Sequence, residues 1–289
     1  MMLQVLLVVL LWALCYPLIT TGLTSFSPFY FAALRSFLAG GSLFVVAYIL
    51  KKPLIPEKSV WIHLVLASLT FASMGFTGMF LAGEKVSPGL ATVIANIQPL
   101  LAALLGYFLL TERLTKLTGV ALFVGFIGIV IISYSGLITV SINSTPTGIG
   151  LVLLGATGVA IGNVILKLIV NRVDSLIAMA WLLLLGAIPL AIAAVVFEEI
   201  DKIIWSMDSI ISLLILSILG TALAFFWWLD LLSKIELNVL NSYTFLTPVF
   251  SLLIGMLFYN ERLFILEWLG VIVIVFSIFI ACFPKNNNS

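Results

Sequence analysis

One stretch of the sequence occurs twice. Residues 99–114 read PLLAALLGYFLLTERL, and residues 248–263, about half a chain later, read PVFSLLIGMLFYNERL. The proline, the glycine and the Glu-Arg-Leu ending align without a gap. A repeat at that spacing, apolar and ending in charges, indicates duplication of a whole membrane-embedded half and not of a short solenoid unit. The repeat therefore predicts a transporter built from two related halves.

The composition places the chain in a lipid bilayer. Hydrophobic residues make up 63% of the sequence and charged residues 9%, whereas soluble proteins carry about 25% charged residues. A net charge of +1 excludes a nucleic-acid partner, which needs clustered Lys and Arg. The two cysteines, Cys15 and Cys282, indicate neither a disulfide framework nor a metal cluster. We expect an integral membrane protein without metal or cofactor.

Hydropathy predicts an all-α protein with ten membrane-spanning helices. A bilayer core about 30 Å thick needs about 20 apolar residues in a helix, and short connections marked by Pro, Gly, Ser or Asn separate such runs here. The first run has no basic segment before it and no small-x-small cleavage site, so we interpret it as a retained span and not as a signal peptide. The predicted spans are residues 2–21, 28–50, 60–82, 88–110, 114–134, 147–170, 175–196, 209–231, 237–258 and 262–283.

The ten spans divide into two five-helix repeats, residues 1–138 and 147–289, joined by a polar linker at residues 139–146. Because five is an odd number, the second repeat enters the membrane from the opposite side, and the repeats are inverted. In that arrangement substrate sites usually lie near the membrane midplane between the halves, and one half rocks against the other to give alternating access.

The positions of Lys and Arg predict that both termini are cytoplasmic. With a cytoplasmic N-terminus, only Lys85, Lys202 and Arg262 lie outside. The inner side then carries Lys51, Lys52, Lys58, Arg113, Lys116, Lys167, Arg172, Lys234 and Lys285.

Residues 10–40, 87–114 and 222–263 carry a resemblance to a known family. They read LLWALCYPLITTGLTSFSPFYFAALRSFLAG, SPGLATVIANIQPLLAALLGYFLLTERL and ALAFFWWLDLLSKIELNVLNSYTFLTPVFSLLIGMLFYNERL. The chain resembles the EamA type of the drug/metabolite transporter superfamily. The resemblance implies a central cavity lined mainly by the first, third, fourth, sixth, eighth and ninth spans. It also implies export or exchange of small metabolites, often amino acids, by a multi-pass protein of the bacterial inner (plasma) membrane.

Polar groups inside a bilayer need internal partners or water, so they mark helix contacts or a pathway. The fourth and ninth spans each carry a polar face at helical spacing, with Thr92, Asn96 and Pro99 on one and Asn241, Thr244 and Pro248 on the other. We hypothesise that five polar residues hydrogen-bond the substrate; the alternative is that they only hold helices together. The five are Tyr16, Asn96, Asn163, Asn241 and Thr244.

Two prolines and one tryptophan have a functional and a structural interpretation each. Pro99 and Pro248 each remove a backbone hydrogen bond within a span, which serves conformational gating or a static kink. Trp12 is the tryptophan nearest the middle of a span. It forms an apolar or cation-binding wall of the site, or it packs as an ordinary core residue.

Arg35 is the residue that is most costly to place in the membrane, because a charge at the bilayer centre costs about 2.5 to 3.5 kcal/mol of insertion free energy. It lies about 12 Å beneath the outer end of the second span by helix rise, and the second half offers no matching arginine. It binds a substrate carboxylate, steadies the fold, or caps helix carbonyls. Lys167 lies near the inner end of the sixth span, where membrane anchoring is the simpler interpretation.

These features favour a secondary transporter for a small neutral or zwitterionic metabolite, with amphipathic drugs as the alternative. A phosphorylated substrate would call for several intramembrane cations. A membrane enzyme would need a nucleophile with a base or a metal motif, and a channel a charge ring or a filter motif. A structural membrane protein would leave the paired polar faces without a purpose. Small-residue spacings such as Gly158-x-x-x-Gly162 serve internal packing or a homodimer.

Overall fold

The computed structural model describes residues 1–82, 85–86, 88–110, 115–139, 145–259 and 264–281. The repeated Glu-Arg-Leu endings, Cys282 and most of the expected linker lie outside this part of the chain. Within it every regular element is helical. Nine helical spans have the length and apolarity to cross a membrane, and the tenth, α14, has 17 described residues. The prediction of an all-α protein with ten spans is confirmed.

Six spans are single helices and four consist of more than one segment. The single helices are α1 (Met2–Leu23), α2 (Pro28–Ile49), α7 (Lys116–Thr139), α8 (Pro146–Ile169) and α9 (Ser175–Phe197), with α14 (Ile265–Ala281) closing the chain. The segmented third and fourth spans are η1 (Lys58–Val60), α3 (Trp61–Ala67), η2 (Ser68–Met74) and α4 (Gly75–Leu81), then α5 (Pro88–Ala95) and α6 (Gln98–Leu109). After η3 (Ile200–Lys202), the eighth and ninth are α10 (Met207–Ser217), η4 (Ile218–Leu223) and α11 (Ala224–Leu232), then α12 (Leu237–Ser242), η5 (Tyr243–Phe245) and α13 (Leu246–Tyr259).

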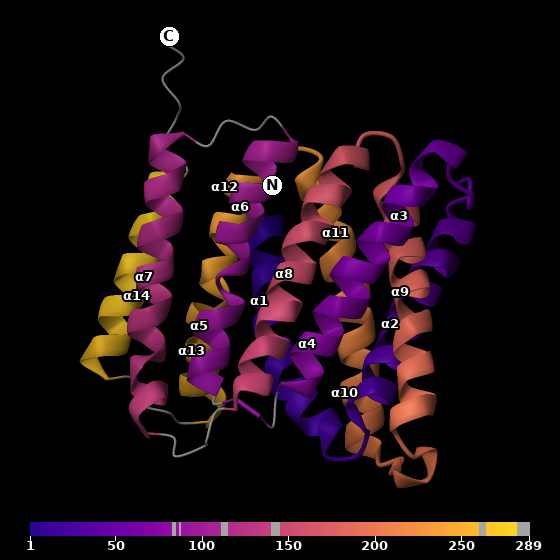
Figure 1. Cartoon of the computed structure of the whole chain (residues 1–289), viewed down its shortest axis with the longest axis horizontal. Helices are drawn as coiled ribbons and strands as arrows, with labels where there is room; N and C mark the ends of the chain where they lie inside the picture. Colours follow the sequence, from indigo (N-terminus) through magenta and orange to yellow (C-terminus); the bar gives the residue numbers. More distant parts are fainter. Residues whose placement is uncertain (83–84, 87, 111–114, 140–144, 260–263, 282–289) are drawn as a thin grey trace.

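The two halves of the bundle run in opposite directions through the membrane. In Figure 1, α1 begins at the upper face and runs down, whereas α8, the first helix of the second half, begins at the lower face and runs up. The helices then pair across the halves: α2 packs on α9, α7 on α14, α8 on the third span and α1 on the eighth. The first two pairings join equivalent helices of the two halves. The last two are equivalent to each other, because α8 corresponds to α1 and the third span to the eighth, as inverted repeats require.

The third and eighth spans share an unusual feature at matching positions. Each contains a π-helical segment, η2 in the third and η4 in the eighth. Ser68 is the first residue of η2 and Ser217 directly precedes η4. The two serines lie 149 residues apart, the same spacing as Pro99 and Pro248. Both hydroxyls donate to the carbonyl four residues earlier, Ser68 at 2.7 Å and Ser217 at 2.6 Å. Such segments occur often at functional sites.

The fourth and ninth spans are both interrupted shortly before their proline. In the fourth, α5 ends at Ala95 and α6 begins at Gln98, directly before Pro99. In the ninth, the 3₁₀ segment η5 separates α12 from α13, and Pro248 lies in the first turn of α13. A proline lacks the N–H that would continue the preceding helix, so each residue favours a break at this place.

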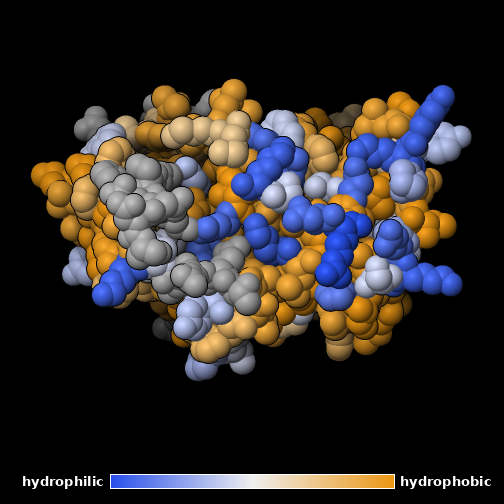
Figure 2. All heavy atoms as spheres, turned by 90° about the horizontal axis from the view of Figure 1, so that it is seen from above, coloured by the Kyte–Doolittle hydropathy of each residue, from blue (hydrophilic) through white to orange (hydrophobic). Residues whose placement is uncertain are grey.

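The surface divides into an apolar flank and polar ends. Figure 2 looks down on the face at which α1 begins, called the upper face below, and shows hydrophilic side chains over the helix ends and hydrophobic ones around the rim. On α14, Ile272, Phe276 and Phe279 are among the exposed large hydrophobic residues. An all-round apolar flank is stable only in lipid.

Candidate substrate-binding site

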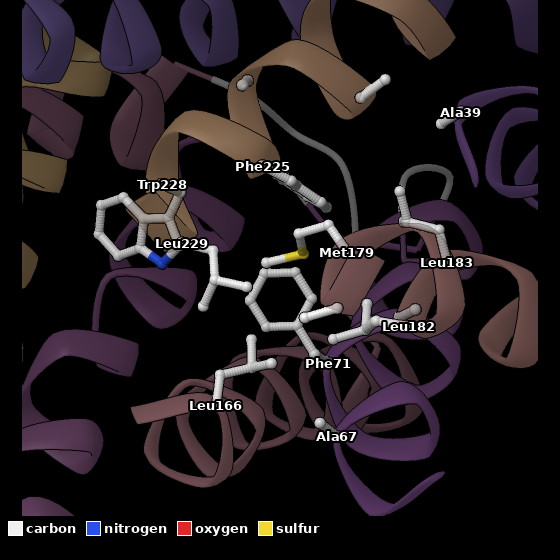
Figure 3. Packing of buried hydrophobic residues seen from close by; sticks show 14 of the residues in the cluster. Ala39, Ala67, Phe71, Leu166, Met179, Leu182, Leu183, Phe225, Trp228 and Leu229 are labelled. Carbon is white, nitrogen blue, oxygen red and sulfur yellow. The ribbon is translucent and has the colours of Figure 1, made fainter. Parts of the chain in front are cut away.

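Aromatic side chains from three spans meet between the two halves. Phe225 of α11 lies 5.1 Å from Phe71 of η2 and 5.9 Å from Trp12 of α1, measured between ring centroids. Trp12 also lies 4.9 Å from Trp228, one turn beyond Phe225. Figure 3 shows Phe71, Phe225 and Trp228 among the packed apolar side chains of this core. We call Trp12, Phe71, Phe225 and Trp228 the aromatic cluster.

The two tryptophans of the aromatic cluster differ in their hydrogen bonding. Trp228 donates its indole N–H to Oδ1 of Asn163 at 2.8 Å, which ties α11 to α8. Trp12 Nε1 is buried and has no partner among the residues that the structure describes. A buried N–H without an acceptor is costly. Trp12 therefore presents a donor that a bound ligand could satisfy.

Arg35 lies beside the aromatic cluster with its side chain almost fully buried. Its Nε donates to Thr221 Oγ1 of η4 at 2.7 Å, and its guanidinium carbon lies 4.6 Å from the centroid of Phe76 and 5.8 Å from that of Phe80. A charge-assisted hydrogen bond contributes about 1.5 to 3 kcal/mol and a desolvated cation–π contact about 2 kcal/mol. Together they offset an insertion cost of about 2.5 to 3.5 kcal/mol.

The guanidinium of Arg35 still has one buried nitrogen, Nη1, without a partner in the described part of the chain. Phe76 contacts both Arg35 and Phe225, with 6.4 Å between the two ring centroids. Arg35 Nη1 and Trp12 Nε1 are thus donors linked to one another through Phe76 and Phe225. This arrangement suits a ligand with an oxygen acceptor and an apolar body.

The asparagines of the two interrupted spans have different surroundings. Asn96 is partly buried and donates to the carbonyl of Thr92, four residues earlier, at 2.8 Å. Asn241 is fully buried, and neither its Nδ2 nor its Oδ1 has a partner among the described residues. Thr244 donates to the Asn241 carbonyl at 2.7 Å. Of these, Asn241 has the hydrogen-bonding capacity that a ligand could use.

The structure brings together some of the predicted site residues. Trp12 packs against Trp228, which donates to Asn163, and Arg35 contacts the same core through the ring of Phe76. Among the described residues no hydrogen bond or ring contact links Asn96, Asn241 or Thr244 to that group, and the side chain of Tyr16 lies outside the described residues. Two hollows, of about 420 and 560 Å³, both lie at the ends of helices and not beside the aromatic cluster. The central cavity stays a prediction.

Three polar features of this region were not predicted from the sequence. Thr221, which accepts from Arg35, lies in a span whose sequence is otherwise apolar at that level. Trp228 lies near the inner end of the eighth span, yet it is buried and donates to Asn163. Asn238 carries a buried Oδ1 without a described partner, one turn before Asn241. The i, i+3 spacing of Asn238 and Asn241 is the signal that could have found the last of these.

Other charged residues near the span ends have structural partners. Lys167 Nζ donates to the carbonyls of Leu232 and Ile235 at 2.7 and 2.6 Å, and so binds the end of α11. Glu198 accepts from the backbone N–H groups of Phe29 and Tyr30 at 2.8 and 3.0 Å, which caps the start of α2. A carboxylate at a helix N-terminus is stabilising. Among the described residues, no three His, Cys, Asp or Glu side chains lie together as a metal site would need.

An inverted bundle of apolar helices with buried polar groups between its halves defines a class, the multi-span membrane transporters. The chain belongs to the EamA-like transporter family, whose pattern matches residues 1–134 and 146–283.

Similar proteins agree with this assignment. The uncharacterized transporter YvbV of Bacillus subtilis is 31% identical over 272 residues, which cover 93% of this chain and 87% of that protein. The uncharacterized transporter sll0355 of Synechocystis is 29% identical, covering 93% and 86%. The uncharacterized inner membrane transporter YedA of Escherichia coli is 26% identical, covering 96% and 88%. One crystal structure has a TM-score of 0.81 at 19% identity, covering 97% and 95%, and shows the fold alone.

Proposed function

We propose that this EamA-family transporter exports or exchanges small zwitterionic or neutral metabolites, amino acids first among them. The observation that carries the proposal is a pair of buried donors without a partner among the described residues, Arg35 Nη1 and Trp12 Nε1. The Arg35 guanidinium lies over Phe76 and the Trp12 ring beside Phe225. A carboxylate would accept from these donors. An ammonium group or an apolar side chain would lie on the aromatic faces.

The charge balance of the core supports a substrate without large net charge. Arg35 is the one charged side chain among the described residues that is buried in the core. One guanidinium matches one carboxylate, whereas a phosphate would call for several cations. The remaining polar groups of the proposed site, Asn163 and Asn241 with Tyr16, Asn96 and Thr244 as further candidates, are uncharged.

Alternating access is the proposed mechanism, and the repeat architecture supports it. We propose two repeats, residues 1–138 and 147–289 with a linker at 139–146, that move against one another around the site. The breaks before Pro99 and Pro248 and the wide turns of η2 and η4 supply matched places at which helices can bend.

We further propose that the protein lies in the inner membrane with its upper face in the cytoplasm. Seven described cations lie at that face, and the lower face has Lys85 and Lys202. This asymmetry follows the positive-inside rule. The seven are Lys51, Lys52, Lys58, Lys116, Lys167, Arg172 and Lys234.

The test is flux of a radiolabelled amino-acid panel into proteoliposomes, with and without an imposed pH gradient. We expect saturable flux that falls at least tenfold in Arg35→Lys, because an ammonium lacks the planar fork of a guanidinium. Asn241→Ala should also lower flux. The matched control is Asn171→Ala, which removes an exposed asparagine of the loop between α8 and α9 and should leave flux unchanged.

Each other outcome has a defined meaning. Flux that is unaltered in both Arg35→Lys and Asn241→Ala would keep the transporter and refute this site. Absence of flux for every amino acid would refute the substrate class. Amphipathic cations or uncharged drugs would then be the next panel, since the aromatic cluster could accommodate them without Arg35. Dependence on the pH gradient would identify proton coupling.

A further inference from the structure

The end of α2 at the upper face has an unusual backbone. Lys51 has φ of 52°, and it is the one non-glycine residue with positive φ in the described part of the chain. The N–H of Lys52 bonds to the carbonyl of Ala47 and that of Lys51 to the carbonyl of Tyr48, both at 3.0 Å. This is the Schellman pattern of helix ends, in which glycine usually occupies the left-handed position. Here a lysine occupies it.

The loop after Lys51 is held in place by contacts to α9. Lys52 forms an ion pair with Asp174, the residue that caps α9 through the backbone N–H of Leu176. Trp181 of α9 donates its indole N–H to the carbonyl of Leu54 at 2.9 Å. The conformation that strains Lys51 is therefore fixed by its surroundings, and a strained residue so fixed is a reason to look for function.

A hollow of about 560 Å³ opens at this place. Its lining residues are Tyr48, Ile49, Lys51, Lys52 and Leu54. Tyr48 and Ile49 are 74% and 69% exposed, so apolar and aromatic surface adjoins the two ammonium groups at the end of a membrane span. Lysine above and apolar surface below match the headgroup and the acyl chains of a phospholipid.

Apart from Lys52, which pairs with Asp174, the cations of this region lack an internal counterion among the described residues. Lys51, Lys58 and Arg172 form no ion pair among the described residues, and Arg172 lies two residues before Asp174. The carbonyl end of α2 adds partial negative charge, which favours lysine there but does not neutralise a second cation. An anionic headgroup would supply the missing charge.

We propose that the hollow at the end of α2 binds an anionic phospholipid, with Lys51 contacting the headgroup phosphate and Tyr48 and Ile49 contacting an acyl chain. The site is separate from the proposed substrate site and does not depend on the transported compound. This contact accounts for a lysine at the left-handed position, where glycine would fit the backbone better.

The substitution Lys51→Gly separates the two roles of this position. Glycine adopts positive φ without strain, so without added lipid the variant should unfold at the same temperature as the wild type or higher. Asparagine also tolerates this conformation, so Lys51→Asn is a second variant of intact fold. The matched control is Lys116→Ala, which removes an exposed lysine of the same face at the opposite end of the molecule (Figure 1).

The experiment compares thermal unfolding midpoints of the purified full chain in neutral detergent, with phosphatidylglycerol, phosphatidylcholine of the same chains, or inorganic phosphate added. In the wild type and in Lys116→Ala, phosphatidylglycerol should raise the midpoint more than the other two additions do. In Lys51→Gly and Lys51→Asn this excess should vanish, and native mass spectrometry should show loss of bound phosphatidylglycerol. An excess that persists in both Lys51 variants, an equal effect of phosphatidylcholine, or an equal effect of inorganic phosphate would overturn the proposal.

Discussion

Two helix crossings that correspond under exchange of the halves are packed in different ways. Where α8 crosses the third span, glycines bring the backbones together: a Cβ on Gly158 would lie 2.5 Å from the Thr70 carbonyl oxygen, and one on Gly162 would lie 2.5 Å from Phe71 Cβ. Where α1 crosses the eighth span, side chains lie between the backbones. There a Cβ on Gly220 would meet Cys15 Sγ at 2.5 Å.

The two crossings differ in which helix carries the glycine and which carries the larger residue. At the 149-residue spacing of the prolines, Phe71 matches Gly220. Because Phe71 faces Gly162 and Gly220 faces Cys15, Cys15 of α1 takes the place that Gly162 has on α8. In the first crossing the small residue is on α8, and in the second it is in η4. Phe71 therefore reaches Phe225, whereas η4 presents no side chain at Gly220. We infer that the first crossing is rigid and the second adjustable.

The largest expected effect concerns the rigid crossing. In Gly158→Ala the new Cβ meets a backbone oxygen that cannot rotate away, and overpacking of this kind costs about 1 to 3 kcal/mol. The monodisperse fraction in detergent and the thermal midpoint should both fall. Gly150→Ala, on the same helix with nothing within 4 Å of its Cβ, should be as stable as the wild type or more so. Equal midpoints for the two variants would disprove backbone contact at Gly158.

The features that could be predicted from the sequence depend on long apolar runs, and those that could not depend on local helix geometry or on distant contacts. Hydropathy located all ten spans, for example residues 28–50 against the observed Pro28–Ile49, because lipid exposure demands long apolar runs. The sequence also identified the paired prolines. It did not reveal η2 and η4, since one extra residue in a turn leaves an apolar run unchanged. Nor did it reveal the contact of Arg35 with Thr221, which lies 186 residues further along the chain.

Three of the residues predicted for the candidate site lie around one core, although their role there stays a prediction. Trp12, Arg35 and Asn163 were expected from their rarity as polar or amphipathic groups in apolar spans, and the structure places them around one core. The partners that connect them, Trp228, Phe225 and Phe76, are ordinary aromatic residues in the sequence. Only the three-dimensional packing distinguishes them from the other aromatic side chains of the spans.

The next effect distinguishes the two tryptophans at the adjustable crossing. Trp12→Phe keeps a ring against Phe225 and Trp228 but removes an N–H that has no described partner, so the thermal midpoint should change little. Flux should fall about two- to tenfold if that N–H binds the substrate, since a hydrogen bond contributes about 0.5 to 1.5 kcal/mol.

Trp228→Phe is the matched comparison. It leaves Oδ1 of Asn163 unpaired in a buried place, so stability should fall by about 1 to 3 kcal/mol. The two variants thus separate a ligand-binding indole from a structural one. Normal flux in Trp12→Phe, measured at equal amounts of folded protein, would assign Trp12 to packing alone.

The smallest effect should come from Gly220→Ala in the adjustable crossing. Its Cβ meets a sulfur atom at the end of a short side chain, and the next contact, Leu216 Cδ1, is at 3.5 Å. Rotation of Cys15 relieves the first contact, although it gives up the weak bond from Sγ to the Gly220 carbonyl at 3.7 Å. Because alanine also favours the helix, we expect a midpoint close to that of the wild type.

The double variant Cys15→Ala/Gly220→Ala should then gain nothing over Gly220→Ala. If Gly220→Ala instead lost as much stability as Gly158→Ala, and Cys15→Ala restored it, both crossings would be equally rigid and the movement between the halves would have to arise at the breaks before Pro99 and Pro248.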